Sequence, residues 1–287
     1  MSPELVLAII NIVLAGIFGA IVGSFTNVCI YRIPEHRTIV KGHSMCMTCG
    51  HELGALDLVP IFSWLFLGGK CRYCKAPISS RYIKIESLTA LCYMIMAATH
   101  LSMFLDPLDP YKNIFPFIEL CALFVMINIV IVEMMIMKDT GSSMYVMTFA
   151  LGIDFLVQLL ARILHTIRDT DSENLSSLVG RGGLQILFGA AIGLLAVTIA
   201  VILTFGLKSL GKYFHDKDSR ALRTSDLFAV ALCAVIGAIP SIVAATIYLI
   251  GRLLIKNGKN VKYLGIFLAS GTAAGYFGYA LFIAFFN

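Results

Sequence analysis

The sequence predicts an all-α polytopic membrane protein, and three observations support this fold class. Of the 287 residues, 59% are hydrophobic and only 14% are charged, whereas soluble domains carry roughly a quarter charged residues. The mean hydropathy is +0.87. Apolar runs of about 20 residues, long enough to cross a lipid bilayer, recur along the chain. Together these features exclude a soluble enzyme and a disordered chain.

The apolar runs predict where the chain crosses the membrane. Residues 226–254 are long enough for two short spans, and Pro240 removes a backbone donor where a turn between them could lie. The first run has no basic start and is too long for a signal peptide, so we interpret it as a retained span. The expected spans are 4–30, 82–103, 114–137, 143–165, 181–207, 226–254 and 263–286.

The Lys and Arg residues orient the chain, because cytoplasmic loops are enriched in both. With two spans in 226–254 the chain crosses about eight times, and most of the 22 basic residues fall on the cytoplasmic side. Both termini then lie outside. A single span would move the basic 252–262 loop outward. Topology also explains the net charge of +5, so we predict no nucleic-acid partner.

This topology divides the chain into three parts. Residues 1–30 form the first transmembrane helix, residues 31–81 form a cytoplasmic loop domain, and residues 82–287 form a membrane core of helices 2 to 8. The loop domain is the only sizeable soluble piece, with about 50 residues. A chain of that size needs a staple because it cannot build a large core.

Cysteines in the loop domain supply that staple. They form two CxxC pairs, and each CxxC turn can present two thiolates to one cation, with Gly50 relaxing the first turn. Four thiolates close a tetrahedral site, so we predict a zinc ribbon with structural Zn²⁺. Disulfides or redox thiols are the alternatives, and a reducing compartment disfavours them. The predicted ligands are Cys46, Cys49, Cys71 and Cys74.

Carboxyl groups within apolar spans are costly and are therefore functional candidates. Glu133 and Asp226 lie at similar shallow depth on the predicted cytoplasmic side. Two facing carboxyls share one proton, which suits aspartyl-type hydrolysis. The alternatives are a helix N-cap for Asp226 and a membrane-edge residue paired with Lys138 for Glu133. Asp154 either bonds a neighbouring helix or marks an ion path in a transporter.

The first third of the chain resembles the type IV prepilin peptidase family, the bifunctional leader peptidases and N-methyltransferases. Residues 23–34, GSFTNVCIYRIP, match the family's GSFxNVxIYRxP motif. Residues 57–65, DLVPIFSWL, resemble its DLIPxxSWL signature. Residues 78–86, ISSRYIKIE, resemble its ISxRYxxxE motif before the second span. The family also has eight spans and a cytoplasmic zinc loop between the first two.

The second half resembles the family in layout and departs from it in the catalytic motifs. Glu133 stands where the family has the Asp of IDxxxxxxPD, and the PD is absent. Asp139 lies six residues later and about 240° around a helix, so it is a poor substitute. Asp226 keeps the Asp of GxGDxK, while both glycines and the lysine are replaced. The resemblance therefore implies Glu133 and Asp226 as the catalytic pair, and whether Asp154 or Asp139 takes the place of Glu133 is left open.

The resemblance implies an intramembrane aspartyl-type endopeptidase of the bacterial inner membrane. It would cut the leader of prepilin or pseudopilin substrates at the cytoplasmic face and then methylate the new N-terminus with S-adenosylmethionine. The alternative is a proteolytically inactive relative that acts as a prepilin-binding scaffold or as a methyltransferase only. A transporter explains the sequence less well, since it gives no role to the zinc ribbon. Homo-oligomerisation is left open.

Overall fold

The computed structural model describes residues 3–100, 110–169, 188–189, 191–199, 201, 220–236, 238–255 and 262–286. Within these ranges the structure is helical, apart from turns and two isolated β-bridges in the first loop. The chain splits into two compact units, Met1–Asn128 and Ile129–Asn287, named unit 1 and unit 2 below. Most of the expected span 181–207 lies outside the described residues.

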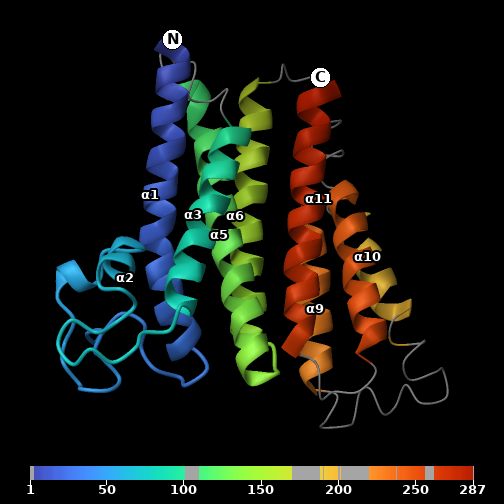
Figure 1. The fold of residues 1–287 in the computed structure, drawn as a ribbon. Coiled ribbons are helices and arrows are strands. Elements are labelled where there is room, and N and C mark those ends of the chain that lie inside the picture. The colour runs from blue at the N-terminus through green and yellow to red at the C-terminus, as the bar shows by residue number, and fades with distance from the viewer. Residues whose placement is uncertain are drawn as a thin grey trace. The chain divides into compact units, whose positions relative to one another are not determined.

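Unit 1 contains α1 (Pro3–Arg32), the short 3-10 helix η1 (Ala55–Asp57), α2 (Phe62–Phe66) and α3 (Arg81–Thr99). Helices α1 and α3 pack side by side, and η1 and α2 lie in the loop between them (Figure 1). The first part of α5 (Pro110–Thr140) also belongs to this unit. The loop therefore folds as a compact appendage at one end of the α1–α3 pair.

Glycines let α1 and α3 approach closely. A Cβ atom at Gly19 would lie 2.9 Å from the Cα atom of Ala90, and one at Gly23 would lie 2.8 Å from the Cα atom of Glu86. Small residues at such crossings bring backbones into van der Waals contact, which is a common way to pack helices in membranes. The glycine of the GSFTN motif is therefore a packing residue.

A buried polar network ties together three helices of unit 1. The Thr26 hydroxyl in α1 donates to Asn128 Oδ1 in α5 at 2.8 Å. The Asn128 amide donates to the Tyr93 hydroxyl of α3 at 2.5 Å. That hydroxyl in turn donates to the Phe124 carbonyl at 3.2 Å. Each side chain has a partner, so the network fixes the register of the helices at little desolvation cost.

Unit 2 contains the rest of α5, together with α6 (Tyr145–Asp169), α9 (Arg220–Ile236), α10 (Ala238–Leu254) and α11 (Leu264–Phe286). Helix α9 packs against α6, α10 and α11, and α10 also packs against α11. The long apolar run 226–254 thus forms two helices, in line with the two-segment interpretation. Helix α9 is described to Ile236 and α10 from Ala238, and Pro240 lies in the first turn of α10, where its missing amide costs no helical bond.

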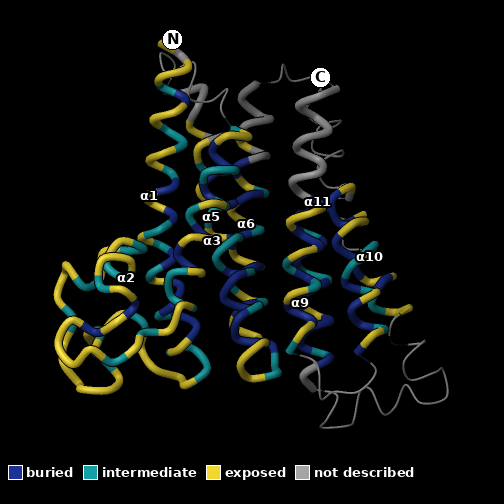
Figure 2. The backbone as a smooth tube through the Cα atoms, in the orientation of Figure 1, coloured by how far each residue is buried: buried dark blue, intermediate teal, exposed yellow. Residues whose placement is uncertain are grey.

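Apolar surface supports a membrane environment. Among the described helices, Leu5–Arg32 and Phe117–Thr140 are long and apolar enough to cross a bilayer, judged by length and composition. Shorter apolar helices cover Tyr145–Ala161, Ile239–Leu254 and Leu264–Gly275. Figure 2 shows α1 alternating between buried and exposed turns. Its exposed side carries large apolar residues: Leu5, Ile9, Val13, Leu14, Ile17 and Ile21. The number of spans stays a prediction.

Candidate metal centre and buried carboxyls

Four cysteine thiols meet in the loop of unit 1. The Sγ atoms of Cys46, Cys49, Cys71 and Cys74 all lie within 4.8 Å of one another, and those of Cys46 and Cys74 are 3.8 Å apart. A tetrahedral Zn²⁺ site with Zn–S bonds of about 2.3 Å requires S–S separations of about 3.8 Å. All four are free thiols. The cluster can therefore hold a metal ion, and its geometry fits Zn²⁺.

The first CxxC pair sits in a turn stabilised by backbone bonds. The Gly50 amide donates to the Cys46 carbonyl at 2.8 Å, and the Cys46 amide donates to the His51 carbonyl at 2.9 Å. Gly50 has a φ of +69°, so the expected role of glycine in this turn is confirmed. Hydrogen bonds from the backbone amides of Cys49 and Thr48 lower the pKa of the Cys46 thiol to about 6, which favours the thiolate that a metal needs.

The second CxxC pair repeats this turn almost bond for bond. The Lys75 amide donates to the Cys71 carbonyl at 3.1 Å, and the Cys71 amide donates to the Ala76 carbonyl at 2.8 Å. Here the left-handed position, with a φ of +58°, is occupied by Lys75. A lysine in this conformation is strained. Sequence reasoning missed this position because only a glycine marks a left-handed residue visibly.

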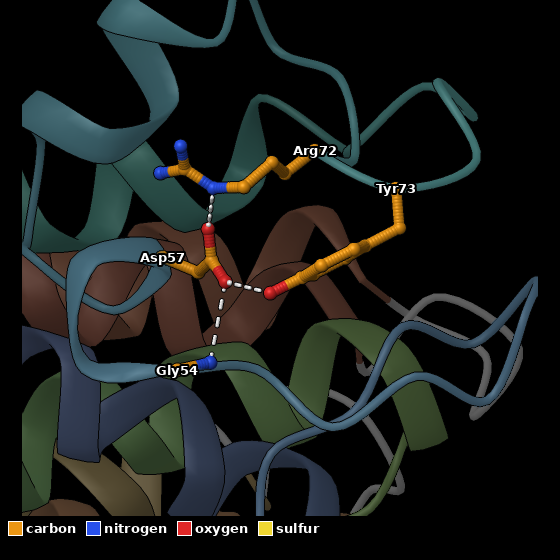
Figure 3. Close-up of polar contacts among 4 residues, drawn as sticks. All are labelled: Gly54, Asp57, Arg72 and Tyr73. Atoms are coloured by element: carbon orange, nitrogen blue, oxygen red, sulfur yellow. Dashed lines mark hydrogen bonds and ion pairs between the residues drawn. The ribbon is translucent and has the colours of Figure 1, made fainter.

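Asp57 connects the two halves of the loop (Figure 3). Its Oδ1 accepts from Arg72 Nε at 2.5 Å, and its Oδ2 accepts from the Tyr73 hydroxyl and the Gly54 amide, both at 3.2 Å. The Arg72 hydrogen bond holds the pKa of Asp57 below its usual value. Arg72 and Tyr73 lie between the two cysteines of the second pair. The Asp of the DLVP run is thus a brace for the thiol cluster.

Glu86 anchors the loop to α3 through a strained turn. Ile61 has a φ of +63°, and the Phe62 amide donates to the Pro60 carbonyl at 2.6 Å. This is the strained form of γ-turn, which is rare for a β-branched residue. The Ile61 amide donates to Glu86 Oε2 at 2.7 Å. The buried carboxyl therefore holds a backbone conformation that costs on the order of 1–3 kcal/mol.

A groove of about 440 Å³ lies beside this turn, between α1 and the loop. Its lining is mostly apolar, with Phe25 and Val28 from α1 facing Leu58 and Val59 from the loop. The polar side chains in the lining are two serines, Ser24 and Ser44. The groove therefore offers an apolar surface and no charged group.

In unit 2, Glu133 is buried in α5 without a hydrogen-bonding partner. Its exposed fraction is 1%, and neither carboxyl oxygen has a partner among the described residues. The Ser143 hydroxyl and the Met144 amide, just before α6 begins at Tyr145, face it, and that hydroxyl also lacks a partner among the described residues. Lys138, the ion-pair partner considered from the sequence, is exposed in the last turn of α5.

Asp226 is also buried, but it has partners of its own. Its Oδ1 accepts from the Tyr248 hydroxyl at 2.7 Å and from Arg252 Nε at 3.2 Å. Asp226 lies in the second turn of α9, which begins at Arg220, so it is not an N-cap. The side chains of Asp226 and Arg252 are 2% and 0% exposed. The structure thus places a fully buried cation against the predicted catalytic acid.

Sequence reasoning assigned Arg252 to a basic cytoplasmic loop, and the structure places it inside α10. The reason is local pairing. Tyr248 and Arg252 are four residues apart and share one helix face, and that face meets Asp226 on the preceding helix. A signal was present, since a Tyr and an Arg one turn apart can serve a single acid.

The remaining candidate acids have other surroundings. Asp154 in α6 accepts from Gln158 of the same helix at 2.8 Å, so its described hydrogen bond is to its own helix. Asp139 is exposed at the end of α5. The structure brings Glu133 and Asp226 into the same compact unit, and among the described contacts none joins the two carboxyls.

The similarity of this chain to known proteins lies mainly in unit 1. Residues 17–100 match the model of the bacterial peptidase A24 N-terminal domain. A prepilin leader peptidase/N-methyltransferase of Dichelobacter nodosus is 35% identical over 34% of this chain and 43% of that relative. The protein of the same name from Myxococcus xanthus is 46% identical over 27% of this chain and 23% of that relative.

A third protein of that name, from Vibrio cholerae, is 40% identical over 27% of this chain and 34% of that relative. The chain thus spans less than half the length of these curated relatives. No solved structure matches the chain. The matched segment contains the GSFTN motif, the thiol cluster, Asp57 and Glu86. The resemblance to the type IV prepilin peptidase family is therefore confirmed over residues 17–100, which match the peptidase A24 N-terminal domain.

Proposed function

We propose that the protein is an intramembrane leader peptidase for prepilin-like or pseudopilin-like substrates, with Glu133 and Asp226 as its catalytic carboxyls. One observation carries this proposal. The two carboxyls at the positions of the family's catalytic acids are both buried in unit 2, with exposed fractions of 1% and 2%. Burying a carboxyl group costs stability, so two such residues in membrane helices indicate a functional site. Unit 1 also matches the model of the peptidase A24 N-terminal domain.

The proposed chemistry needs one ionised and one protonated carboxyl. The ionised carboxylate removes a proton from water, which attacks the carbonyl carbon of the scissile peptide, while the protonated carboxyl polarises the carbonyl oxygen. Glu133 carries one methylene more than the Asp of the family motif, and its carboxyl therefore reaches about 1.5 Å further. The proposal requires that the backbone of unit 2 compensates for this extra reach.

The metal centre has a structural role in the proposal. Zn²⁺ held by Cys46, Cys49, Cys71 and Cys74 has no open position for a substrate, so it organises the loop. S-adenosylmethionine does not fit the groove described in unit 1, since a cationic sulfonium and an amino-acid head need charged or strongly polar partners and the lining offers two serines. N-methylation of the new N-terminus is therefore proposed on family resemblance alone.

Location and partners follow from the same proposal. We place the protein in the bacterial inner membrane as a multi-pass protein with about eight spans, both termini outside and the metal-binding loop in the cytoplasm. An apolar substrate segment would then be bound and cut at the cytoplasmic face. All three predicted parts would take part: the first helix (1–30), the loop domain (31–81) and the core (82–287). Helix α1 ends at Arg32 and α3 begins at Arg81.

The test is cleavage of a prepilin-type substrate by the purified full chain in detergent. Glu133→Gln and Asp226→Asn are each expected to lower the rate at least 1,000-fold, because each removes one member of the acid pair. Asp154→Asn is the matched control, since it neutralises a buried acid in the same unit that contacts its own helix. The prepilin peptidase of Vibrio cholerae serves as the positive control for the substrate.

The outcomes separate the two functions considered for the chain. Loss of cleavage in both amide variants, with full activity of Asp154→Asn, supports the Glu133–Asp226 pair. Wild-type protein that does not cleave, while Glu133→Asp does, supports an inactive relative that binds or methylates the substrate. Unchanged activity of Glu133→Gln removes Glu133 from the site.

A further inference from the structure

The short helix α2 carries three large apolar side chains on its outer surface. Phe62, Leu65 and Phe66 have exposed fractions of 57%, 54% and 85%. They lie on one side of the helix because they are three or four positions apart, and the rings of Phe62 and Phe66 stack with their centroids 6.3 Å apart. These three residues are called the α2 face below. An exposed apolar surface of this kind marks a site of interaction.

The opposite side of α2 is fixed to the loop. Trp64 lies two positions from both Phe62 and Phe66, which is about 200° around the helix. Its Nε1 donates to the Ile78 carbonyl at 3.2 Å, and a Cβ atom at Gly69 would lie 2.8 Å from its ring. The Gly69 amide also donates to the Trp64 carbonyl at 2.9 Å. Since Trp64 holds one side of α2, the α2 face is presented outward by the fold itself.

The α2 face continues the apolar side of α1. On α1, Ile17, Ile21 and Phe25 are exposed and four positions apart, so they share one side of the helix. Ile21 and Phe25 line the groove together with Leu58 and Val59, which are also exposed and come just before α2. In Figure 1, α2 lies beside α1 rather than beyond its end. Apolar surface therefore runs from α1 through the groove to α2.

The loop meets α1 at the level of a membrane surface. Helix α1 has 30 residues and is thus about 45 Å long, while a bilayer with its headgroups is about 40–45 Å thick. The α1 residues of the groove run from Ile21 to Val28, which places them about 6–16 Å before the end of the helix at Arg32. In a helix that crosses the bilayer, this level is the boundary between headgroups and acyl chains.

The charges next to α2 suit a lipid surface. Residues 58–80 include Lys70, Arg72 and Lys75 and contain no acidic residue. Arg72 pairs with Asp57, whereas the side chains of Lys70 and Lys75 are exposed. Lysines near a membrane surface are attracted to anionic headgroups. An apolar face flanked by lysines is the pattern of a segment that lies in the membrane interface.

We propose that the α2 face is a membrane anchor that seats the metal-binding loop in the interface of the same bilayer that α1 crosses. This inference goes beyond the proposed peptidase function and does not depend on it. Gly69, which packs on Trp64, lies two residues before Cys71 of the thiol cluster. The metal site therefore keeps α2 in the orientation that the anchor needs.

The test uses Trp64, the single tryptophan of the sequence, as its probe. The full chain is reconstituted into vesicles of phosphatidylcholine and phosphatidylglycerol whose acyl chains carry bromine, a short-range quencher, either near the headgroup or near the chain end. Bromine near the headgroup is expected to lower the Trp64 fluorescence about twofold, and bromine near the chain end to lower it less, because an anchor of this kind lies in the interface.

Two variants connect this quenching to the α2 face. Replacing Phe62 and Phe66 together by serine should remove more than half of the quenching, because the loop then loses its apolar contact with lipid. Val40→Ser removes an apolar side chain that is 87% exposed and lies outside α2; it is the matched control and should leave the quenching unchanged. Zinc content shows whether each variant is folded. If the double variant loses zinc, Phe66→Ser alone, at the most exposed of the three positions, replaces it and should remove a smaller part of the quenching.

Three results would overturn the inference. The first is wild-type Trp64 that neither brominated lipid quenches. The second is unchanged quenching in a zinc-loaded serine variant. The third is Trp64 that lipid does not quench but that a prepilin-type segment shields from an aqueous quencher, since the α2 face would then bind a protein.

Discussion

The two compact units treat buried polar groups in different ways. In unit 1, Thr26, Asn128 and Tyr93 form a chain of hydrogen bonds, and the carboxyl of Glu86 accepts the Ile61 amide. In unit 2, both carboxyl oxygens of Glu133 and both terminal nitrogens of Arg252 lack partners among the described residues. Most motif residues of unit 1 thus have a role in assembling the fold, although the Oδ1 atom of Asn27 also lacks a partner among the described residues. In unit 2 the unpartnered atoms belong to charged groups, whose burial costs more and is not explained by assembly.

The largest expected effect is the loss of zinc, which should disrupt unit 1 and leave unit 2 intact. Replacing Cys46 and Cys71 together by serine should abolish zinc binding, which contributes about 10–16 kcal/mol in small zinc domains. The loop should unfold, and the fluorescence of Trp64, the single tryptophan, should shift to the red because its ring loses Gly69 and the Ile78 carbonyl. Metal analysis and fluorescence measure this.

Circular dichroism should change little in the same double variant, because the ligands all lie in unit 1. Cys121→Ser, which alters an exposed thiol outside the cluster, is the control and should retain one zinc per chain. A double variant that keeps its full zinc content would contradict the assignment of the ligands.

A second comparison lies within unit 2. Asp226→Asn should destabilise the protein by about 3–5 kcal/mol, because Arg252 is left as a buried charge without compensation. Glu133→Gln should change stability by less than about 1 kcal/mol, since an unpartnered carboxyl loses no hydrogen bond when it becomes an amide. Thermal unfolding in detergent, followed by circular dichroism, gives both values. Equal losses of unfolding free energy in the two variants would contradict the prediction that only Asp226 compensates a buried charge.

A third comparison sets a glycine of unit 1 against one of unit 2. Gly23→Ala should cost about 1–3 kcal/mol, because its Cβ would meet the backbone of Glu86 at 2.8 Å and force α1 from α3. Gly152→Ala should be neutral or stabilising by up to about 1 kcal/mol, since nothing lies within 4 Å of that position in α6. Unfolding of each purified variant decides the order.

The smallest effect compares the two cysteine turns. Gly50→Ala should weaken zinc affinity about tenfold, because a left-handed alanine costs on the order of 1–2 kcal/mol. Lys75→Gly should strengthen it by up to about tenfold, because it relieves the same strain in the second turn. Competition with a zinc chelator at fixed pH measures both. An affinity gain in Gly50→Ala would mean that the φ of +69° is not maintained in solution.

The sequence predicts well the features that depend on residues close together in the chain. The thiol cluster follows from two CxxC pairs because each pair closes within one turn. The presence of two helices, α9 and α10, along 226–254 follows from the length of the apolar run. The strained Ile61 and Lys75 could not be predicted, since their conformations are held by contacts from elsewhere, such as the Glu86 carboxyl.

The position of Arg252 shows a different limit. Counting basic residues assigns it to a loop, because charge statistics treat every Arg near a span end as solvated. A buried pair breaks that assumption, and only the packing of α10 on α9 shows the partner. The depth argument pairs Glu133 with Asp226, which stays a prediction, and it carries no information about the cation that contacts Asp226 from α10.

The Asp226–Arg252 contact also bears on how the protein is made. The two residues are 26 positions apart, on consecutive described helices, so both leave the ribosome in close succession. An isolated Arg entering lipid costs about 2.5–3.5 kcal/mol in the insertion machinery. If α9 and α10 enter as a preformed hairpin, their opposite charges enter as a neutral pair. Biogenesis would then favour insertion of this hairpin as one step, after the acid has met its cation.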